Sequence, residues 1–204
     1  GEPRRNLQHG RELSHGQHRR SLPGELGAEG GGELVSGAQT EVAAAWRAGA
    51  LDLDGAVRVV FERSRSMAGE RGLGRMAAVA LSATEAARRL EGQGGRVGIA
   101  AVNGPGSVVL AGEPDALEDA LRGLREAGVR TKDLGVDFAF HGPAMAALAS
   151  PLEEALAGLV PRPPLVPIWS TLSGERAGAS DFGPRHWGRH AAEPVRFGPA
   201  LERM

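Results

Sequence analysis

The stretch VGIAAVNGPGSVVLAG, residues 97–112, has the pattern of two short strands joined by a tight turn. Both halves, 97–102 and 107–112, are rich in small aliphatic and β-branched residues. The residues between them, Asn-Gly-Pro-Gly (103–106), are typical of a turn because Gly and Pro interrupt regular pairing. The stretch therefore predicts a β-hairpin.

One strand and one helix flank the hairpin on each side. Before it, RMAAVAL (75–81) predicts a strand, and Ser82 with Glu85 forms a capping box at the start of a helix. After it, Pro114 lies in the first turn of a predicted helix, and RTKDLGVDF (130–138) predicts a strand. The resulting order β-α-β-β-α-β is that of a ferredoxin-like fold.

Helical patterns occur on both sides of this unit. EVAAAWRAG (41–49) predicts a short helix that ends at its glycine, and LDLDGAVRVVFERSRSM (51–67) predicts a longer amphipathic one. In the longer helix, five residues recur at helical spacing: Leu53, Val57, Val60, Phe61 and Ser64. Further along, we expect a helix over about 143–159, a strand over 165–172, and a short helix after HWGRHAAEPVRF (186–197).

The composition favours a globular α/β protein and excludes several kinds of site. The chain has 204 residues, of which 41% are hydrophobic, and its formal net charge is −1. Balanced charge gives no electrostatic argument for a nucleic-acid or membrane partner. Cysteine is absent, which excludes disulfides, thiolate metal ligands and a cysteine nucleophile. No apolar run reaches the roughly 18 to 20 residues of a membrane span, so we expect a cytoplasmic protein.

Residues 1–33 differ from the rest of the chain. They hold three of the six histidines and many Arg, Gly and Glu, with scattered leucines and no periodicity. Such a segment buries too little apolar surface to offset its ordering entropy, so we expect it to be irregular or disordered. A nucleic-acid-binding arm is the alternative, although glutamates interrupt the arginines. The histidines lack regular metal-ligand spacing, so no metal site is predicted.

From about residue 35 to 204 the chain resembles the acyltransferase domains of modular polyketide synthases, which are related to malonyl-CoA:acyl-carrier-protein transacylases. Several blocks carry the resemblance in the same order. They are EVAAAWRAGALDLDGAVRVVFERSR (41–65), AAVNGPGSVVLAGEPDAL (100–117), VDFAFH (136–141), VPIWSTLSGE (166–175) and HWGRHAAEPVRF (186–197).

The resemblance implies a nucleophile elbow of the form Gly-His-Ser-x-Gly-Glu before the first helix. Aligning Glu41 with the elbow's glutamate places Ala38 at the nucleophile serine, Gln39 at the backbone oxyanion donor and Thr40 at the second glycine. The register is supported by Arg63, which follows Ala38 by the 25 residues that separate the family's serine from its carboxylate-binding arginine. A guanidinium fork suits the free carboxylate of a malonyl group.

The same resemblance assigns two residues of the VDFAFH block. His141 is at the position of the catalytic histidine, which takes the serine proton and returns it to the leaving thiol. Phe140 is at the position that correlates with extender choice, and an aromatic ring there resembles the malonyl type. Phe138 departs from the Tyr or His that is commoner at its position.

The resemblance also implies a fold class, partners and a substrate. We expect an α/β protein with an incomplete α/β-hydrolase-like large subdomain, residues 34–74 and 139–204, into which a ferredoxin-like subdomain, residues 75–138, is inserted. Malonyl-CoA would be the substrate, and the acceptor would be the phosphopantetheine arm of an acyl carrier protein, with other synthase domains as neighbours. No bound cofactor or metal is implied.

Three departures from the family predict that transfer is absent or very weak. Ala38 has no hydroxyl to acylate, and Thr40 puts a Cβ where the elbow has glycine. Family members also have a longer segment before the elbow, with strands of the central sheet and a glutamine loop. Ser36 and Ser14 are poor substitutes for the nucleophile because neither has the elbow's context.

The same departures are compatible with two alternatives to a degenerate enzyme. In the first, the domain is a non-catalytic structural spacer within a multidomain synthase. In the second, a shifted reading frame before about Val35 hides an intact elbow and an ordinary enzyme.

Overall fold

A computed structural model describes residues 37–70 and 72–204. The segment 1–33, expected to be irregular or an arm, and the expected approach to the elbow, Leu34-Val35, lie outside the described residues. Among the residues that are described, no helix is both long and apolar enough to cross a bilayer.

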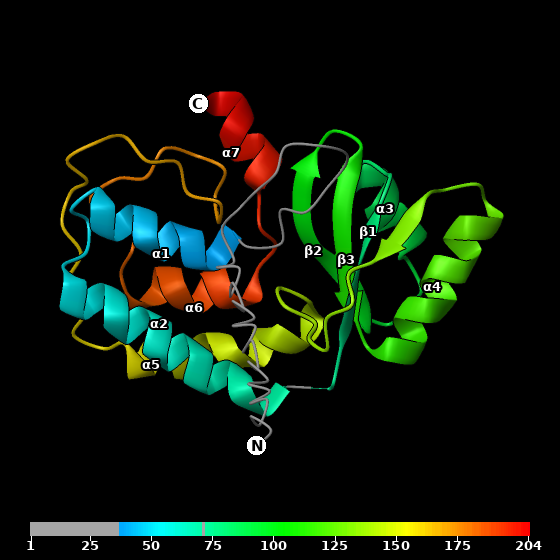
Figure 1. The fold of residues 1–204 in the computed structure, drawn as a ribbon, viewed down its shortest axis with the longest axis horizontal. Coiled ribbons are helices and arrows are strands. Elements are labelled where there is room, and N and C mark those ends of the chain that lie inside the picture. Colours follow the sequence, from blue (N-terminus) through cyan, green and yellow to red (C-terminus); the bar gives the residue numbers. More distant parts are fainter. Residues whose placement is uncertain (1–36, 71) are drawn as a thin grey trace, which may run out of the picture. The chain divides into compact units, whose positions relative to one another are not determined.

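The hairpin predicted from 97–112 is present, and it forms part of a four-stranded antiparallel sheet. The sheet order is β2-β3-β1-β4. The strands are β1 Arg75–Val79, β2 Val97–Gly104, β3 Ser107–Gly112 and β4 Thr131–Asp133. Helix α3 (Ala83–Arg89) follows β1 and helix α4 (Pro114–Glu126) follows β3, so the chain has the β-α-β-β-α-β order that the sequence predicts (Figure 1).

Local capping chemistry places these elements. The Ser82 side chain accepts a hydrogen bond from the Glu85 N–H at 3.2 Å, as a capping residue should. Strand β4 ends at Asp133, earlier than the predicted 138. The cause is a turn in which Gly135 adopts φ 65° and donates its N–H to Asp133 Oδ1 at 2.8 Å.

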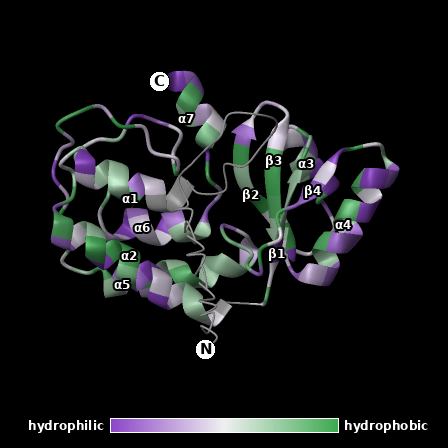
Figure 2. Cartoon of the chain, viewed as in Figure 1, coloured by the Kyte–Doolittle hydropathy of each residue, from purple (hydrophilic) through white to green (hydrophobic). Residues whose placement is uncertain are grey.

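Each face of the sheet packs against a different set of side chains. One face forms a core with α3 and α4, in which Leu110, Leu117 and Leu121 are almost fully buried. The opposite face packs Met76 and Val109 against residues that follow the sheet in the chain. Figure 2 shows the hydrophobic colouring of β2 and β3, while α4 alternates between hydrophobic and hydrophilic residues.

The remaining elements are helices, several of which contribute to a second core. Phe182, Trp187, Leu152 and Leu156 are almost fully buried there, and the Trp187 indole N–H donates to the Phe182 carbonyl at 2.7 Å. The elements are α1 Gly37–Arg47, α2 Leu53–Met67, η1 Ala68–Glu70, η2 Pro143–Leu148, α5 Ala149–Ala155, α6 Pro184–Ala192 and α7 Phe197–Arg203.

Helix α2 presents a different face to this core than its apolar pattern suggests. The stripe Leu53, Val57, Val60 and Phe61 is between 42% and 62% exposed. The buried face instead carries Gly55, Ala56, Val59, Arg63 and Met67. Small residues on that face let α2 approach its neighbours closely, and this brings the Arg63 guanidinium inside the protein.

Two predicted elements differ in the structure. The helix expected over 143–159 is divided into η2 and α5, because Pro151 has no N–H and is tolerated only in the first turn of a new α-helix. The strand expected over 165–172 is wrong: only an isolated bridge joins Trp169 to Arg176. Thr171 there donates its N–H to a side chain, Glu41, rather than to a strand. In the described part of the chain, strands of a sheet occur only between residues 75 and 133.

Helix α6 is fixed between the helical core and the sheet. Gly188 lets α6 approach α5 so closely that a Cβ there would lie 2.5 Å from the Ala149 carbonyl oxygen. Beyond α6, Val195 pairs with the edge of β2, donating to the Ala100 carbonyl at 2.9 Å and accepting from the Val102 N–H at 2.8 Å. The C-terminal end of α6 is therefore held on both sides.

Candidate functional site

His141 lies in the loop after the sheet and is held by the C-terminal end of α6. Its backbone is left-handed (φ 58°), its side chain is 8% exposed, and its Nδ1 lies 3.0 Å from the Glu193 carbonyl oxygen. A carbonyl oxygen only accepts, so Nδ1 carries the hydrogen and Nε2 keeps its lone pair. This is the tautomer that a general base requires at Nε2.

Burial keeps this imidazole neutral. Burial, followed by the nearby positive charge of Arg63, lowers the pKa of His141 to about 3, although hydrogen bonds to the Glu193 and His190 backbone oppose the shift. At neutral pH His141 therefore has a free lone pair rather than a second proton.

Arg63 is the cation whose charge lowers the pKa of His141. It is 8% exposed and lies on the buried face of α2. Burial lowers the pKa of Arg63 to about 10, and the negative charge of Glu41 opposes this, so the guanidinium stays charged at neutral pH. Its Nε has no hydrogen-bond partner among the described residues. A buried, charged guanidinium with spare donors is suited to an anionic ligand.

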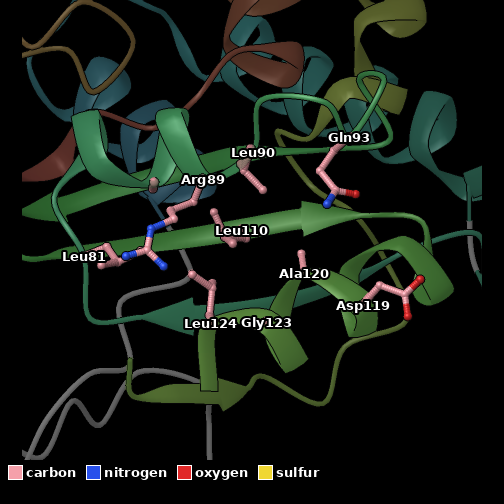
Figure 3. A pocket seen from close by; sticks show the side chains of 10 residues that line it. Leu81, Arg89, Leu90, Gln93, Leu110, Asp119, Ala120, Gly123 and Leu124 are labelled. Carbon is pink, nitrogen blue, oxygen red and sulfur yellow. The ribbon is translucent and has the colours of Figure 1, made fainter. Parts of the chain in front are cut away.

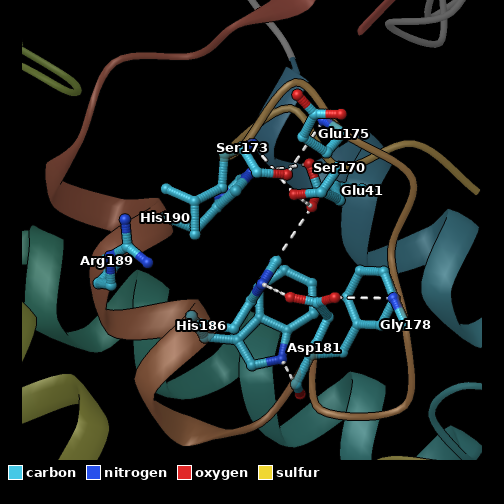
Figure 4. Close-up of polar contacts among 12 residues, drawn as sticks. Glu41, Ser170, Ser173, Glu175, Gly178, Asp181, His186, Arg189 and His190 are labelled. Atoms are coloured by element: carbon cyan, nitrogen blue, oxygen red, sulfur yellow. Dashed lines mark hydrogen bonds and ion pairs between the residues drawn. The ribbon is translucent and has the colours of Figure 1, made fainter. Parts of the chain in front are cut away.

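Glu41 is the most highly hydrogen-bonded side chain near these two residues. Its Oε1 accepts from Ser170 Oγ at 2.7 Å and lies 3.1 Å from His186 Nε2. Its Oε2 accepts from the N–H of Thr171 at 2.7 Å and from that residue's hydroxyl, and lies 3.2 Å from His190 Nε2 (Figure 4).

Glu41 is ionised despite its burial. Burial by itself raises the pKa of a carboxyl, but hydrogen bonds from His186, His190 and Thr171 outweigh it and hold the pKa of Glu41 far below its ordinary value. Burial also lowers the pKa of His190, while Glu41 opposes that shift. The cluster is thus an ionised carboxylate that accepts hydrogen bonds from side-chain and backbone donors.

The structure places the predicted nucleophile position in a helix. Helix α1 begins at Gly37 rather than near Glu41, so positions 38 and 39 lie in its first turn, one turn before Glu41. The first N–H groups of a helix have no partner within the helix, which is the property required of an oxyanion donor. Glu41 and His190 connect this helix to His141, whose ring centroid lies 6.0 Å from that of His190.

The aromatic residues before His141 form a rigid pair. Phe138 and Phe140 stack with ring centroids 4.8 Å apart and an interplanar angle of 8°. Both rings are half-buried. The stack fixes the orientation of Phe140, the predicted extender-choice residue, next to His141.

Sequence reasoning missed the residues around Glu41. Glu41 itself was used only to set the register of the elbow, and Ser170 and Thr171 lay in a predicted strand. The available signal was the four-residue spacing of His186 and His190, because residues at that spacing share one face wherever the segment is helical. No helix was predicted over these residues, whereas the structure has α6 there. Among the described residues no group of three or more His, Cys, Asp or Glu is arranged to hold a metal ion.

A separate hollow of about 260 Å³ opens between α3 and α4 (Figure 3). Its walls are mainly apolar and include Leu81, Leu90 and Leu124, and Arg89 and Asp119 also line it. The Arg89 Nε already donates to Glu85 at 2.8 Å, so its charge is compensated. The hollow lies on the α3–α4 side of the sheet, whereas the residues after the sheet pack on the other face.

Comparison with known proteins identifies the family. A model described as the acyl transferase domain matches residues 34–204. The chain belongs to the acyl transferase domain family. The resemblance to polyketide synthase acyltransferase domains is thereby confirmed.

Curated relatives are large synthases. The chain is 44% identical over 172 residues to polyketide synthase GfsB of Streptomyces halstedii, covering 84% of this chain and 3% of GfsB. It is 39% identical over 171 residues to erythronolide synthase EryA2 of Saccharopolyspora erythraea, covering 84% of this chain and 5% of that synthase. The chain thus spans a small part of the length of these relatives.

Solved structures of acyltransferases have the same fold over most of the described chain. The acyltransferase domain from module 8 of the salinomycin polyketide synthase matches with a TM-score of 0.77 and 36% identity, covering 81% of this chain and 39% of that one. Malonyl CoA-acyl carrier protein transacylase from Clostridium perfringens matches with a TM-score of 0.73 and 28% identity, covering 80% of this chain and 54% of that one.

Proposed function

We propose that this chain is a polyketide synthase acyltransferase domain that binds a malonyl thioester but does not transfer its acyl group, or does so very weakly. One observation supports this most directly: a buried cationic Arg63 and a neutral, oriented His141 accompany an alanine at position 38. The base and the carboxylate-binding group are kept, and the nucleophile is absent.

The residues have the following roles in this proposal. Arg63 pairs with the free carboxylate of the malonyl group through its guanidinium, and the Gln39 backbone N–H faces the thioester oxygen as an oxyanion donor. Phe140, held by Phe138, limits the volume beside the α-carbon and favours malonyl over branched extenders. Ala38 has no oxygen to acylate, so an acyl-enzyme does not form there.

The proposal includes the domain organisation and the partners. Residues 34–74 and 139–204 form the hydrolase-like part of the acyltransferase, and residues 75–138 form its ferredoxin-like part. Malonyl-CoA is the acyl donor, no cofactor is bound, and the phosphopantetheine arm of an acyl carrier protein is the acceptor in intact relatives. The antiparallel order β2-β3-β1-β4 supports the ferredoxin-like assignment.

Calorimetric titration with malonyl-CoA tests the binding step. We expect binding by the unaltered chain, loss of binding in Arg63→Gln, and no change in Arg65→Gln. Arg65 is the matched control because it is two residues further along α2 and 65% exposed, where it pairs with Glu62. If the unaltered chain does not bind malonyl-CoA, or if both variants bind equally, the substrate proposal is wrong.

Intact-mass measurement after incubation with malonyl-CoA tests the missing nucleophile. We expect no adduct on the unaltered chain and a malonyl adduct on the double variant Ala38→Ser, Thr40→Gly. An adduct on any serine of the unaltered chain contradicts the proposed loss of transfer. A double variant without adduct contradicts the view that position 38 is the decisive defect.

The alternative function is that of a structural spacer between neighbouring synthase domains. The same alanine at position 38 favours it, since a spacer needs no nucleophile. A spacer also has no use for a carboxylate site, so binding of malonyl-CoA through Arg63 decides against it.

A further inference from the structure

We propose that Glu41 is a positioning residue that holds helix α6 and, through the C-terminal carbonyls of that helix, fixes His141 in the tautomer with a free Nε2. This inference rests on the proposed function, in which His141 is the base. Neither the proposed substrate chemistry nor the packing of the core requires a carboxylate at position 41.

The Glu41 carboxylate accepts a hydrogen bond in each of its five polar contacts. An ionised carboxylate only accepts, so Ser170 Oγ–H, the two Thr171 donors and the Nε2–H groups of His186 and His190 all point toward it. These donors come from a loop and from α6, whereas Glu41 belongs to α1. One side chain of α1 therefore joins two segments that lie between 129 and 149 residues further along the chain.

His190 has its ring hydrogen on Nε2. Because Nε2 carries the hydrogen that faces Glu41, the Nδ1 of the neutral ring has a lone pair, and this atom is buried without a partner in the described part of the chain. His190 thus has the opposite tautomer to His141, whose hydrogen is on Nδ1. The Glu41 carboxylate and the Thr171 hydroxyl, whose oxygen lies 3.3 Å from His190 Nε2, together compensate His190 for its burial.

The backbone at the C-terminal end of α6 connects His190 to His141. The carbonyls that accept from His141 belong to Glu193 and, as a weaker contribution, to His190 itself. Glu193 caps α6 and donates its N–H to the Arg189 carbonyl at 2.7 Å. A change in how the His190 side chain is held therefore displaces the last turn of α6, which carries the acceptors for His141.

Two contacts with Glu41, rather than one, define the orientation of α6. His186 and His190 are one turn apart on the same face of the helix and both contact the Glu41 carboxylate. Two points on one face fix the rotation of a helix about its axis. That rotation sets the direction in which the C-terminal carbonyls point.

Packing alone is the competing cause of the placement of α6. Trp187 is almost fully buried between the two histidines, and Gly188 lies close to Ala149 on α5. If packing is sufficient, Glu41 contributes to stability and leaves the His141 tautomer unaffected. The measurement must therefore report the tautomer separately from stability.

Long-range ¹H–¹⁵N correlation spectra of the full chain labelled with ¹⁵N-histidine provide this measurement. In the unaltered chain we expect His141 with a hydrogen on Nδ1 and His190 with a hydrogen on Nε2. In Glu41→Gln, whose amide group cannot accept all five bonds, we expect the His141 signals to become those of a mixture of tautomers. Urea denaturation of the same samples records the change in stability.

Two control variants separate positioning from general loosening. Glu193→Gln alters only a surface side chain that pairs with Arg189, and it keeps the backbone carbonyl, so the His141 tautomer should be unchanged. Leu156→Ala weakens the same core at a buried residue that follows α5, so it should lower stability and leave the tautomer unchanged. A tautomer mixture in Leu156→Ala as large as that in Glu41→Gln contradicts the inference.

A pair of variants at position 190 keeps the inference testable if Glu41→Gln does not fold. His190→Gln retains an amide donor for Glu41 and should preserve the His141 tautomer, whereas His190→Leu loses the donor and should give the mixture. Retention of the Nδ1–H form in both Glu41→Gln and His190→Leu overturns the positioning role. If His141 in the unaltered chain is not in the Nδ1–H form, the base assigned under the proposed function is itself wrong.

Discussion

Lowering the pH below the ordinary pKa of histidine should destabilise this protein, because burial lowers the pKa of His141 and acts in the same direction on His190. Its pKa in the folded state is lowered to about 3 by burial and by Arg63, whereas the ordinary value of 6.5 applies to the unfolded chain. Between these two values the unfolded chain binds a proton that the folded protein does not. Above pH 6.5, His141 therefore has no destabilising effect on the folded state. As the pH falls from 6.5 toward 3, protonation of His141 in the unfolded chain lowers the free energy of unfolding.

The size of the effect follows from the width of this window. Each pH unit below the unfolded pKa costs about 1.36 kcal/mol while the folded imidazole remains neutral. At pH 4.5 the expected loss is roughly 2.7 kcal/mol relative to pH 7.5. Glu41 acts in a lower window, because its pKa is depressed: its contribution is present above the unfolded value of 4.5 and is lost as the pH falls further.

Urea denaturation at pH 7.5 and 4.5 measures this loss, with His141→Asn as the comparison. Asparagine tolerates the left-handed backbone at this position and offers an amide donor where Nδ1 was. The variant does not titrate, so it should lose about 2.7 kcal/mol less than the unaltered chain over the same pH interval. If the free energy of unfolding falls equally in the two proteins, the pKa of His141 is not lowered in the folded state, and the environment of His141 has been described incorrectly.

Two further pairs of substitutions test the packing around the site. Gly188→Ala should destabilise the fold by about 1–3 kcal/mol in urea denaturation, because its Cβ would lie 2.5 Å from the Ala149 carbonyl oxygen. The added Cβ of Gly123→Ala in α4 meets nothing within 4 Å, so this variant should stabilise the fold by roughly 0.5–1 kcal/mol. Val59→Ala on the buried face of α2 should cost about 2 kcal/mol, and Val57→Ala, at a residue that is 59% exposed, should cost less than about 0.5 kcal/mol. Equal costs for the two valines would favour the face suggested by the apolar stripe.

Much of the sheet could be predicted because its signals are local. The cap at Ser82 and the turn of the hairpin act within a few residues, and both are present, although β2 extends to Gly104 and the turn is confined to 105–106. The prediction failed where distant contacts decide. Leu53 and Phe61 follow helical spacing as well as Val59 does, yet the small residues beside Val59 make that face the one that packs.

The candidate site was predictable only in part. Resemblance and spacing selected Arg63 and His141, and the structure buries both and places the Arg63 charge where it lowers the pKa of His141. The partners of Glu41 were not predictable, because they lie 129 or more residues away in the chain and include Thr171 in a segment predicted to be a strand. Sequence periodicity carries no information about hydrogen bonds at such separations.

By itself, the sequence determined the β-α-β-β-α-β order and the absence of a hydroxyl at position 38, because capping, turns and the identity of an atom are local properties. Only the tertiary structure decided the state of the groups around that position. Burial makes His141 neutral, while Glu41 and Arg63 stay charged although they are buried as well. The carbonyl of Glu193, 52 residues away in the chain, then selects which nitrogen of His141 keeps its lone pair.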